Sequence, residues 1–168
     1  SSDVCSSDLP RGEIWRNDIK ENYKQHRVGD NQAGNFFKLV YSENLFEQAG
    51  IETILSYPKL EADDCIALSV KHLLAKTDGD VEIYIITSDK DYLQLVDNRV
   101  SVWRPVVKTT YTPEVVLEKL KVPAHNYLLL KLFIGDNSDN IKGVDGIGLK
   151  TLQKYLQILL LLLLPLLN

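Results

Sequence analysis

The 168-residue sequence contains no methionine and only two cysteines. Because it begins with two serines and not with an initiator methionine, we expect it to be a fragment of a longer protein. Cys5 and Cys65 match no disulfide or metal-binding spacing, which argues against a disulfide-stapled secreted domain and predicts a reducing, cytoplasmic environment. Cys65 is therefore expected to be a small core residue.

Positive charge is also scarce, since 19 lysines and arginines face 23 aspartates and glutamates and the net charge is −4. This balance excludes a uniformly basic nucleic-acid binder, but a local basic face beside an acidic metal site fits it. No membrane span is expected, because the apolar run at the carboxyl end is shorter than the roughly 20 residues that a bilayer requires, and a proline interrupts it. With 45% hydrophobic and 25% charged residues, the composition is typical of one globular domain.

Both ends of the chain differ from the rest in composition. Residues 1–9 resemble the translation of a short-read sequencing adapter and are set aside from the fold. Residues 157–168 are nearly all leucine and are interpreted as a low-complexity end. Between them we expect an α/β core at residues 10–130 and a smaller helical region at residues 131–156.

Alternating helical and strand patterns predict an α/β fold with a parallel sheet. Helices are expected at 35–49, 61–76 and 91–96, and a further helix is expected to start at Thr112, which a proline and an acid follow. Strands are expected at 51–57, 81–87 and 100–106. The strand at 81–87 is almost free of charge, which predicts a central position with both faces covered.

Acidic residues form three groups along the chain. In an open α/β sheet, ligands bind beyond the carboxyl ends of the strands, where the first two groups are expected. Crowded carboxylates are tolerated mainly when a divalent cation neutralises them, and oxygen ligands favour Mg²⁺ or Mn²⁺ over Zn²⁺. Each group alone is more typical of a solvated helix start or a surface turn, so only their combination predicts a metal site. The groups are Glu61, Asp63 and Asp64; Asp89 and Asp91; and Asp136 and Asp139.

A basic segment and a glycine turn supply what phosphate binding requires. Residues 15–27 interleave Trp15 and Tyr23 with basic residues, a mixture that binds phosphates and stacks on bases, and that also suits a solvated amphipathic helix. The glycine turn at 143–148 lies directly before a helix, where backbone amides can face a phosphate. The basic residues of the segment are Arg16, Lys20, Lys24, His26 and Arg27, and those beside the turn are Lys142, Lys150 and Lys154.

The motifs EADD, TSDKDYLQLV and GDNSDNIKGVDGIGLKT, preceded by YKQHR, resemble in their order and distances the 5′ nuclease superfamily. This superfamily includes phage 5′-to-3′ exonucleases, the N-terminal nuclease domain of bacterial DNA polymerase I, and flap endonucleases. The resemblance extends from Trp15 to Leu156. It implies a PIN-like or resolvase-like nuclease core with a parallel sheet, an appended helix-hairpin-helix region at 131–156, and a monomer that hydrolyses phosphodiesters of DNA with 5′ ends or flaps.

The resemblance also implies residue roles. The seven acids of the three groups would bind two Mg²⁺ or Mn²⁺ ions directly or through water. Lys24 and Arg27 would steer and polarise the scissile phosphate, and the glycine turn would grip duplex DNA, often with a bound K⁺. Two acid-bearing strands that the family places before the YK..R element have no counterpart here, so we expect impaired activity. The DNA-binding residues would be Arg16, Lys20, Lys142, Gly143, Gly146, Gly148 and Lys150.

Two alternatives stay open at this point. A PIN-type ribonuclease also arranges acids around a parallel sheet, although the glycine turn favours a grip on duplex DNA. A non-catalytic protein that binds branched DNA would keep the turn without metal chemistry, although the seven acids argue against it.

Overall fold

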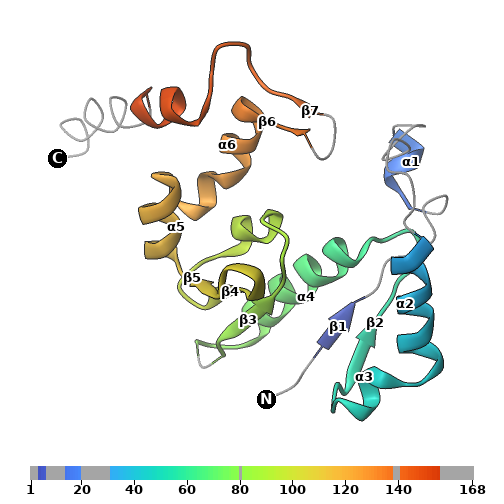
Figure 1. Ribbon diagram of the computed structural model, residues 1–168. Helices are drawn as coiled ribbons and strands as arrows, with labels where there is room; N and C mark the ends of the chain where they lie inside the picture. The colour runs from blue at the N-terminus through green and yellow to red at the C-terminus, as the bar shows by residue number, and fades with distance from the viewer. Residues whose placement is uncertain (1–3, 7–13, 20–30, 80, 138–140, 156–168) are drawn as a thin grey trace. The chain divides into compact units, whose positions relative to one another are not determined.

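Figure 1 shows the computed structural model, which describes residues 4–6, 14–19, 31–79, 81–137 and 141–155. The chain divides into two compact units, Ser1–His72 and Leu73–Asn168. Both units combine short strands with helices, so the predicted α/β content is confirmed. Among the residues in these ranges, no helix is long and apolar enough to cross a membrane.

The first unit contains a parallel pair of short strands, β1 (Val4–Ser6) and β2 (Thr53–Leu55). β1 falls within residues 1–9, which were set aside from the fold, so Val4–Ser6 does take part in a strand pair, while the adapter origin of residues 1–9 stays a prediction. The single helix predicted at 35–49 is instead two helices, because Asn44 adopts a left-handed conformation with φ 52°. The helices of this unit are α1 (Arg16–Ile19), α2 (Asn31–Ser42), α3 (Leu45–Gln48) and the first turns of α4 (Ala62–Lys76).

The second unit contains a three-stranded sheet in the order β3 (Ile83–Ile86), β4 (Val100–Arg104) and β5 (Thr109–Tyr111). β3 and β4 are parallel, as predicted, but β4 and β5 are antiparallel, so the sheet is mixed. β5 follows directly on η3 (Pro105–Val107), after which Lys108 takes a left-handed conformation with φ 48° and the chain reverses. Because a local pattern of three residues carries little strand signal, the sequence did not predict β5.

The position of β3 also differs from the expectation. In the described part of this unit, β3 is an edge strand, and its alternate side chains Tyr84 and Ile86 are exposed. An apolar run predicts a strand but does not distinguish a central strand from an edge strand. The buried core lies instead around β4, since Val100 and Val102 have no exposed surface and Val116 of α5 (Pro113–Leu120) is equally buried.

Two helical segments of this unit have defined ends. The carbonyls of Leu74 and Thr77 at the end of α4 accept hydrogen bonds from the Arg99 guanidinium at 2.9 and 2.8 Å. Thr112 caps α5 by accepting a hydrogen bond from the backbone N–H of Val115, which confirms the predicted helix start. The helix predicted at 91–96 is the short 3-10 helix η2 (Asp91–Leu95).

The end of the second unit is a helix followed by a small hairpin. After η4 (Ala124–Asn126) come α6 (Tyr127–Ile134), the antiparallel pair β6 (Gly135–Asp136) and β7 (Ile141–Lys142), and helical residues at 149–155. The backbones of Gly135 and Gly143 cross closely, since a Cβ on Gly143 would lie 2.4 Å from the carbonyl carbon of Ile134. Only glycine fits there, so this contact fixes the strand that carries Asp136.

Candidate functional site

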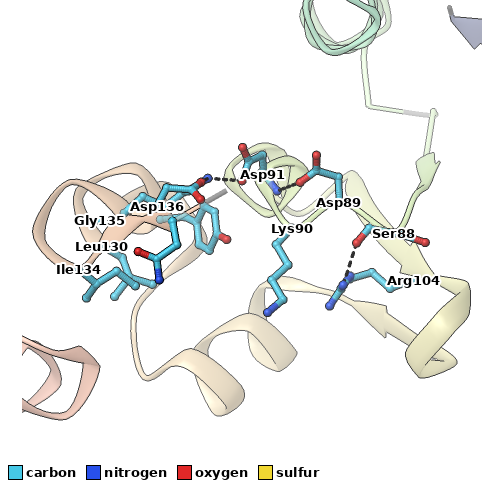
Figure 2. Close-up of a pocket in the computed structure, with 12 residues that line it drawn as sticks. Ser88, Asp89, Lys90, Asp91, Arg104, Leu130, Ile134, Gly135 and Asp136 are labelled. Carbon is cyan, nitrogen blue, oxygen red and sulfur yellow. Dashed lines mark hydrogen bonds and ion pairs between the residues drawn. The ribbon is translucent and has the colours of Figure 1, made fainter. Parts of the chain in front are cut away.

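A pocket of about 410 Å³ in the second unit is lined by acids from two of the predicted groups. Figure 2 shows Asp89, Asp91 and Asp136 around it. Asp89 lies in the loop after β3, Asp91 begins η2, and Asp136 ends β6. The fold therefore brings acids from two distant segments of the chain to one pocket.

The loop after β3 is held by its own side chains. The backbone N–H of Asp89 donates to the hydroxyl of Thr87 at 3.0 Å, and the backbone N–H of Asp91 donates to Asp89 Oδ1 at 2.8 Å. Short polar side chains that accept such bonds stabilise a turn and start a helix. The carboxylate of Asp89 is therefore fixed at the N-terminal end of η2, next to Asp91.

Lys131 of α6 joins two of these acids. Its Nζ lies 2.5 Å from Asp136 Oδ2 and also pairs with Asp91 Oδ1. Burial acts to lower the pKa of Lys131, but the hydrogen bonds with Asp136 and Asp91 outweigh burial and raise this pKa. The lysine therefore stays charged, and two carboxylates share one cation. Sequence reasoning missed Lys131, whose signal was a lone cation in the otherwise apolar helix YLLLKLFI.

Lys90 and Arg104 add positive charge to the lining of the same pocket. Arg104 donates to the backbone carbonyl of Ser88 at 2.8 Å, as Figure 2 shows, and its guanidinium lies 5.9 Å from the ring centre of Tyr111. Its Nε is buried and has no hydrogen-bond partner among the described residues. Cations beside acids in one pocket suit a site that receives both a metal and an anion. Sequence reasoning assigned neither residue a role.

The remaining acidic group lies in the first unit and surrounds Arg16. The Arg16 guanidinium contacts Asp64 with two nitrogens, at 2.7 and 2.8 Å, and lies 2.7 Å from Glu61 Oε2. The hydrogen bond from Arg16 lowers the pKa of Asp64, although burial opposes this shift. Glu61 is buried, while Asp63 of α4 is exposed. Arg16, predicted to bind DNA, is thus engaged by two acids that were predicted to bind metal.

The predicted DNA-binding turn is open at two of its glycines. Gly146 has φ 79°, and a Cβ on Gly146 or Gly148 would meet nothing within 4 Å. Lys142 pairs with Asp145 at 3.2 Å, and both side chains are largely exposed. Lys150 is exposed in the helical segment that follows. The predicted residues Lys20, Lys24, Arg27 and Asp139 lie outside the described residues.

The acids of the pocket fit a divalent cation in their chemistry. All three offer carboxylate oxygens, the ligands that Mg²⁺ and Mn²⁺ prefer. Asp91 and Asp136 already share the ammonium group of Lys131, so they reach one positive centre. Within the described ranges, no three His, Cys, Asp or Glu side chains gather closely enough to form a metal-binding group. The metal role of these acids therefore stays a prediction.

The sequence matches a known family along most of its length. A family model described as the 5′-3′ exonuclease N-terminal resolvase-like domain matches residues 2–121. Because this match covers more than half of the 168 residues, the chain belongs to the 5′-3′ exonuclease family. The resemblance to the 5′ nuclease superfamily is thereby confirmed.

Curated relatives include polymerases and a free-standing exonuclease. The chain is 37% identical over 158 residues to DNA polymerase I of Caldicellulosiruptor bescii. The aligned region covers 88% of this chain and 17% of that protein. It is 33% identical over 138 residues to a 5′-3′ exonuclease of Buchnera aphidicola. This aligned region covers 82% of this chain and 46% of that protein. The chain thus spans less than half the length of both relatives.

Solved structures with a similar fold come from bacteriophage T5. T5 5′-exonuclease with bound zinc ions has a TM-score of 0.71 and 22% identity over 92% of this chain and 58% of that chain. The T5 flap endonuclease in a pseudo-enzyme–product complex with DNA and metal ions has a TM-score of 0.68 and 22% identity. The match covers 92% of this chain and 57% of that chain. These similarities show that the chain has the resolvase-like 5′ nuclease fold.

Proposed function

We propose that this chain is the nuclease part of an enzyme that hydrolyses phosphodiester bonds of DNA at 5′ ends or flaps, using two Mg²⁺ or Mn²⁺ ions. Membership of the 5′-3′ exonuclease family supports the reaction class. The observation that carries the proposal is the pocket whose lining includes Asp89, Asp91 and Asp136, from two distant segments of the chain. In this proposal the parent enzyme acts as a monomer in the cytoplasm.

The chain's own residues divide the work between metal and phosphate. Asp89, Asp91 and Asp136 hold metal ions in the second unit, and Asp139 adds a further carboxylate. When bound, the ions supply an activated water and neutralise the leaving oxygen. Lys90 and Arg104 attract a backbone phosphate to the same pocket, since both are cations in its lining. Lys24 and Arg27 steer the scissile phosphate. Because the activated water attacks the phosphorus, no side chain is needed as a nucleophile.

We also propose that the end of the second unit is the helix-hairpin-helix region, which holds duplex DNA by its backbone. Its parts are α6, the β6–β7 pair with the following turn, and the helical residues 149–155. The open space around Gly146 and Gly148 supports this role, because a phosphate needs close access to backbone amides. Lys142 and Lys150 add positive charge beside the turn, and K⁺ is a candidate ion there.

The test measures cleavage of a 5′-flap oligonucleotide with Mg²⁺ and with EDTA. We expect cleavage by the chain to require Mg²⁺. Asp89→Asn should abolish cleavage and leave binding of the flap unchanged, because the amide keeps the shape of the side chain and removes its charge. Asp78→Asn, which changes an exposed acid outside the pocket, is the matched control and should cut at the parent rate.

Two results would contradict the proposal. Equal cleavage by Asp89→Asn and the parent would exclude the pocket as the metal site. Binding of the flap with no Mg²⁺-dependent cleavage, in the chain and in a version extended at its amino end, would favour the non-catalytic DNA-binding alternative.

A further inference from the structure

The carboxylate of Asp64 is occupied by hydrogen bonds from inside the protein. Asp64 Oδ2 accepts from Trp15 Nε1 at 3.1 Å, from an Arg16 nitrogen at 2.7 Å, and from the backbone N–H of Glu61 at 3.0 Å. Asp64 Oδ1 accepts from the other Arg16 nitrogen at 2.8 Å. An ionised carboxylate offers about four acceptor sites, and Asp64 accepts four N–H donors, three at Oδ2 and one at Oδ1. A metal ion bound at Oδ2 would have to displace one of them.

These bonds tie Asp64 to the start of α4. The bond from the Glu61 N–H is the return bond of a capping box, in which a side chain in the first turn binds the residue before the helix. Arg16 contacts Asp64 with two parallel bonds, the geometry in which arginine binds a carboxylate most firmly. The side chains of Arg16 and Asp64 are 26% and 16% exposed, so their contact is partly buried and is screened less than a contact at the surface.

The segment that supplies these donors is itself held in place. The Arg16 guanidinium lies 4.7 Å from the centre of the Trp15 ring, and the Trp15 backbone N–H donates to the carbonyl of Lys59 at 2.9 Å. Lys59 pairs with Asp18 at 3.0 Å. Arg16 is therefore presented to Asp64 by contacts on both sides, and its guanidinium also reaches Glu61.

We propose that Asp64 is the anchor of the acidic motif and not a metal ligand, and that Arg16 is a positioning residue and not a DNA contact. Together they hold the first turn of α4, so that Glu61 and the exposed Asp63 are presented to a divalent cation. Such outer contacts orient the ligands of metal sites in general. The inference rests on the proposed metal-dependent function for the role of Glu61 and Asp63, but the anchor itself is defined without metal.

The first experiment tests the anchor without metal or activity. The unfolding midpoint in urea is measured for the 168-residue chain, for Arg16→Ala, for Asp64→Ala and for the double variant. We expect both single variants to lower the midpoint, and the double variant to lower it by less than the sum of the two single losses, because the Arg16–Asp64 contact is lost in each. Lys71→Ala, which removes an exposed side chain farther along α4, is the control and should leave the midpoint unchanged. Additive losses would overturn the anchor.

The second experiment uses Mn²⁺ affinity, which separates positioning from simple charge effects. If Arg16 were only a nearby positive charge, its removal would strengthen Mn²⁺ binding by relieving repulsion. Positioning predicts the opposite sign, so Arg16→Ala weakens Mn²⁺ binding, by about tenfold if it resembles other outer contacts of metal sites. Adding Asp64→Ala to this variant should cause a smaller loss than Asp64→Ala causes in the parent. Unbound Mn²⁺ is measured by electron paramagnetic resonance at concentrations where circular dichroism shows each variant folded.

Two further variants make the result decisive. Arg16→Lys keeps the charge without the two-pronged contact, and it should fall between the parent and Arg16→Ala in both measurements. Asp63→Asn should weaken Mn²⁺ binding while lowering the unfolding midpoint less than Asp64→Ala does. Tighter Mn²⁺ binding in Arg16→Ala would overturn the inference. If the parent binds no Mn²⁺, the proposed metal site fails, and the urea experiment alone decides on the anchor.

Discussion

One lysine forms ion pairs with two carboxylates in the second unit. The ammonium group of Lys131 contacts both Asp91 and Asp136, and these three side chains are 21%, 38% and 14% exposed. A partly buried ion pair loses much of its solvation, so removing one partner leaves the other charge poorly compensated. The same lysine would compete with a divalent cation for these oxygens. Its contacts therefore predict opposite effects on stability and on metal affinity.

Lys131→Met should lower the free energy of unfolding without metal by about 1 to 2 kcal/mol, less than a fully buried pair because the lysine is partly exposed. With saturating Mg²⁺ the deficit should shrink, since the ion replaces the lost charge. Urea unfolding with EDTA and with MgCl₂ measures both values. Lys142→Met, which breaks only the exposed pair with Asp145, is the control and should change neither. A deficit that is independent of Mg²⁺ would contradict the shared-cation interpretation.

A second residue-scale prediction concerns Tyr127, which lines the same pocket. Burial raises the pKa of Tyr127 to about 12, with Asp91, Asp89 and Asp136 adding to the shift and Lys131 opposing it. Because this pKa is above the value of about 10 in an unfolded chain, the neutral phenol favours the folded state. This contribution is fully present below about pH 10 and is lost as the pH rises through about 12.

We therefore expect Tyr127 to ionise later than an exposed tyrosine. Ultraviolet absorbance during an alkaline titration should lose its late step in Tyr127→Phe. A late step that persists in this variant would show that Tyr127 is not protected from solvent.

At the scale of elements, the start of α5 and the long α4 followed from local rules. A threonine cap with proline behind it started α5 where expected, because such signals act within one turn. The break at Asn44, the antiparallel β5 and the β6–β7 pair were missed, since each depends on a conformation or partner that a local window does not contain. The same limit applies to the site. The acids were found by their type and spacing, whereas Lys131 and the Arg16 contacts required the folded chain.

The close crossing of Gly135 and Gly143 makes a clear prediction for the β6–β7 element. A Cβ on Gly143 would lie 2.4 Å from the carbonyl carbon of Ile134 and 2.5 Å from the backbone nitrogen of Gly135. Backbone atoms cannot rotate away as a side chain can, so Gly143→Ala should cost about 2 kcal/mol or more. Gly148→Ala meets nothing within 4 Å and should keep the parent stability. Thermal unfolding by circular dichroism compares the two, and equal melting temperatures would contradict the crossing.

At the scale of the whole molecule, the net charge of −4 means that the proposed attraction to DNA has to come from local groups. Around the glycine turn, Lys142 and Lys150 are exposed cations beside backbone that a phosphate can approach. Binding through phosphates releases counterions, so affinity should fall steeply with salt and depend little on base sequence. The slope of log affinity against log salt concentration then gives the number of phosphate contacts.

Affinity for flap DNA should therefore be measured over a range of salt concentrations in EDTA, which separates binding from cleavage. If each lysine contacts one phosphate, Lys142→Ala and Lys150→Ala should each reduce the slope of log affinity against log salt by about 1. Lys119→Ala changes an exposed lysine of α5 and serves as the charge-matched control with the parent slope. Gly148→Ala should weaken binding at every salt concentration with an unchanged slope, because it obstructs the backbone without removing charge. Equal slopes for all four variants would contradict a role of the glycine turn in binding DNA.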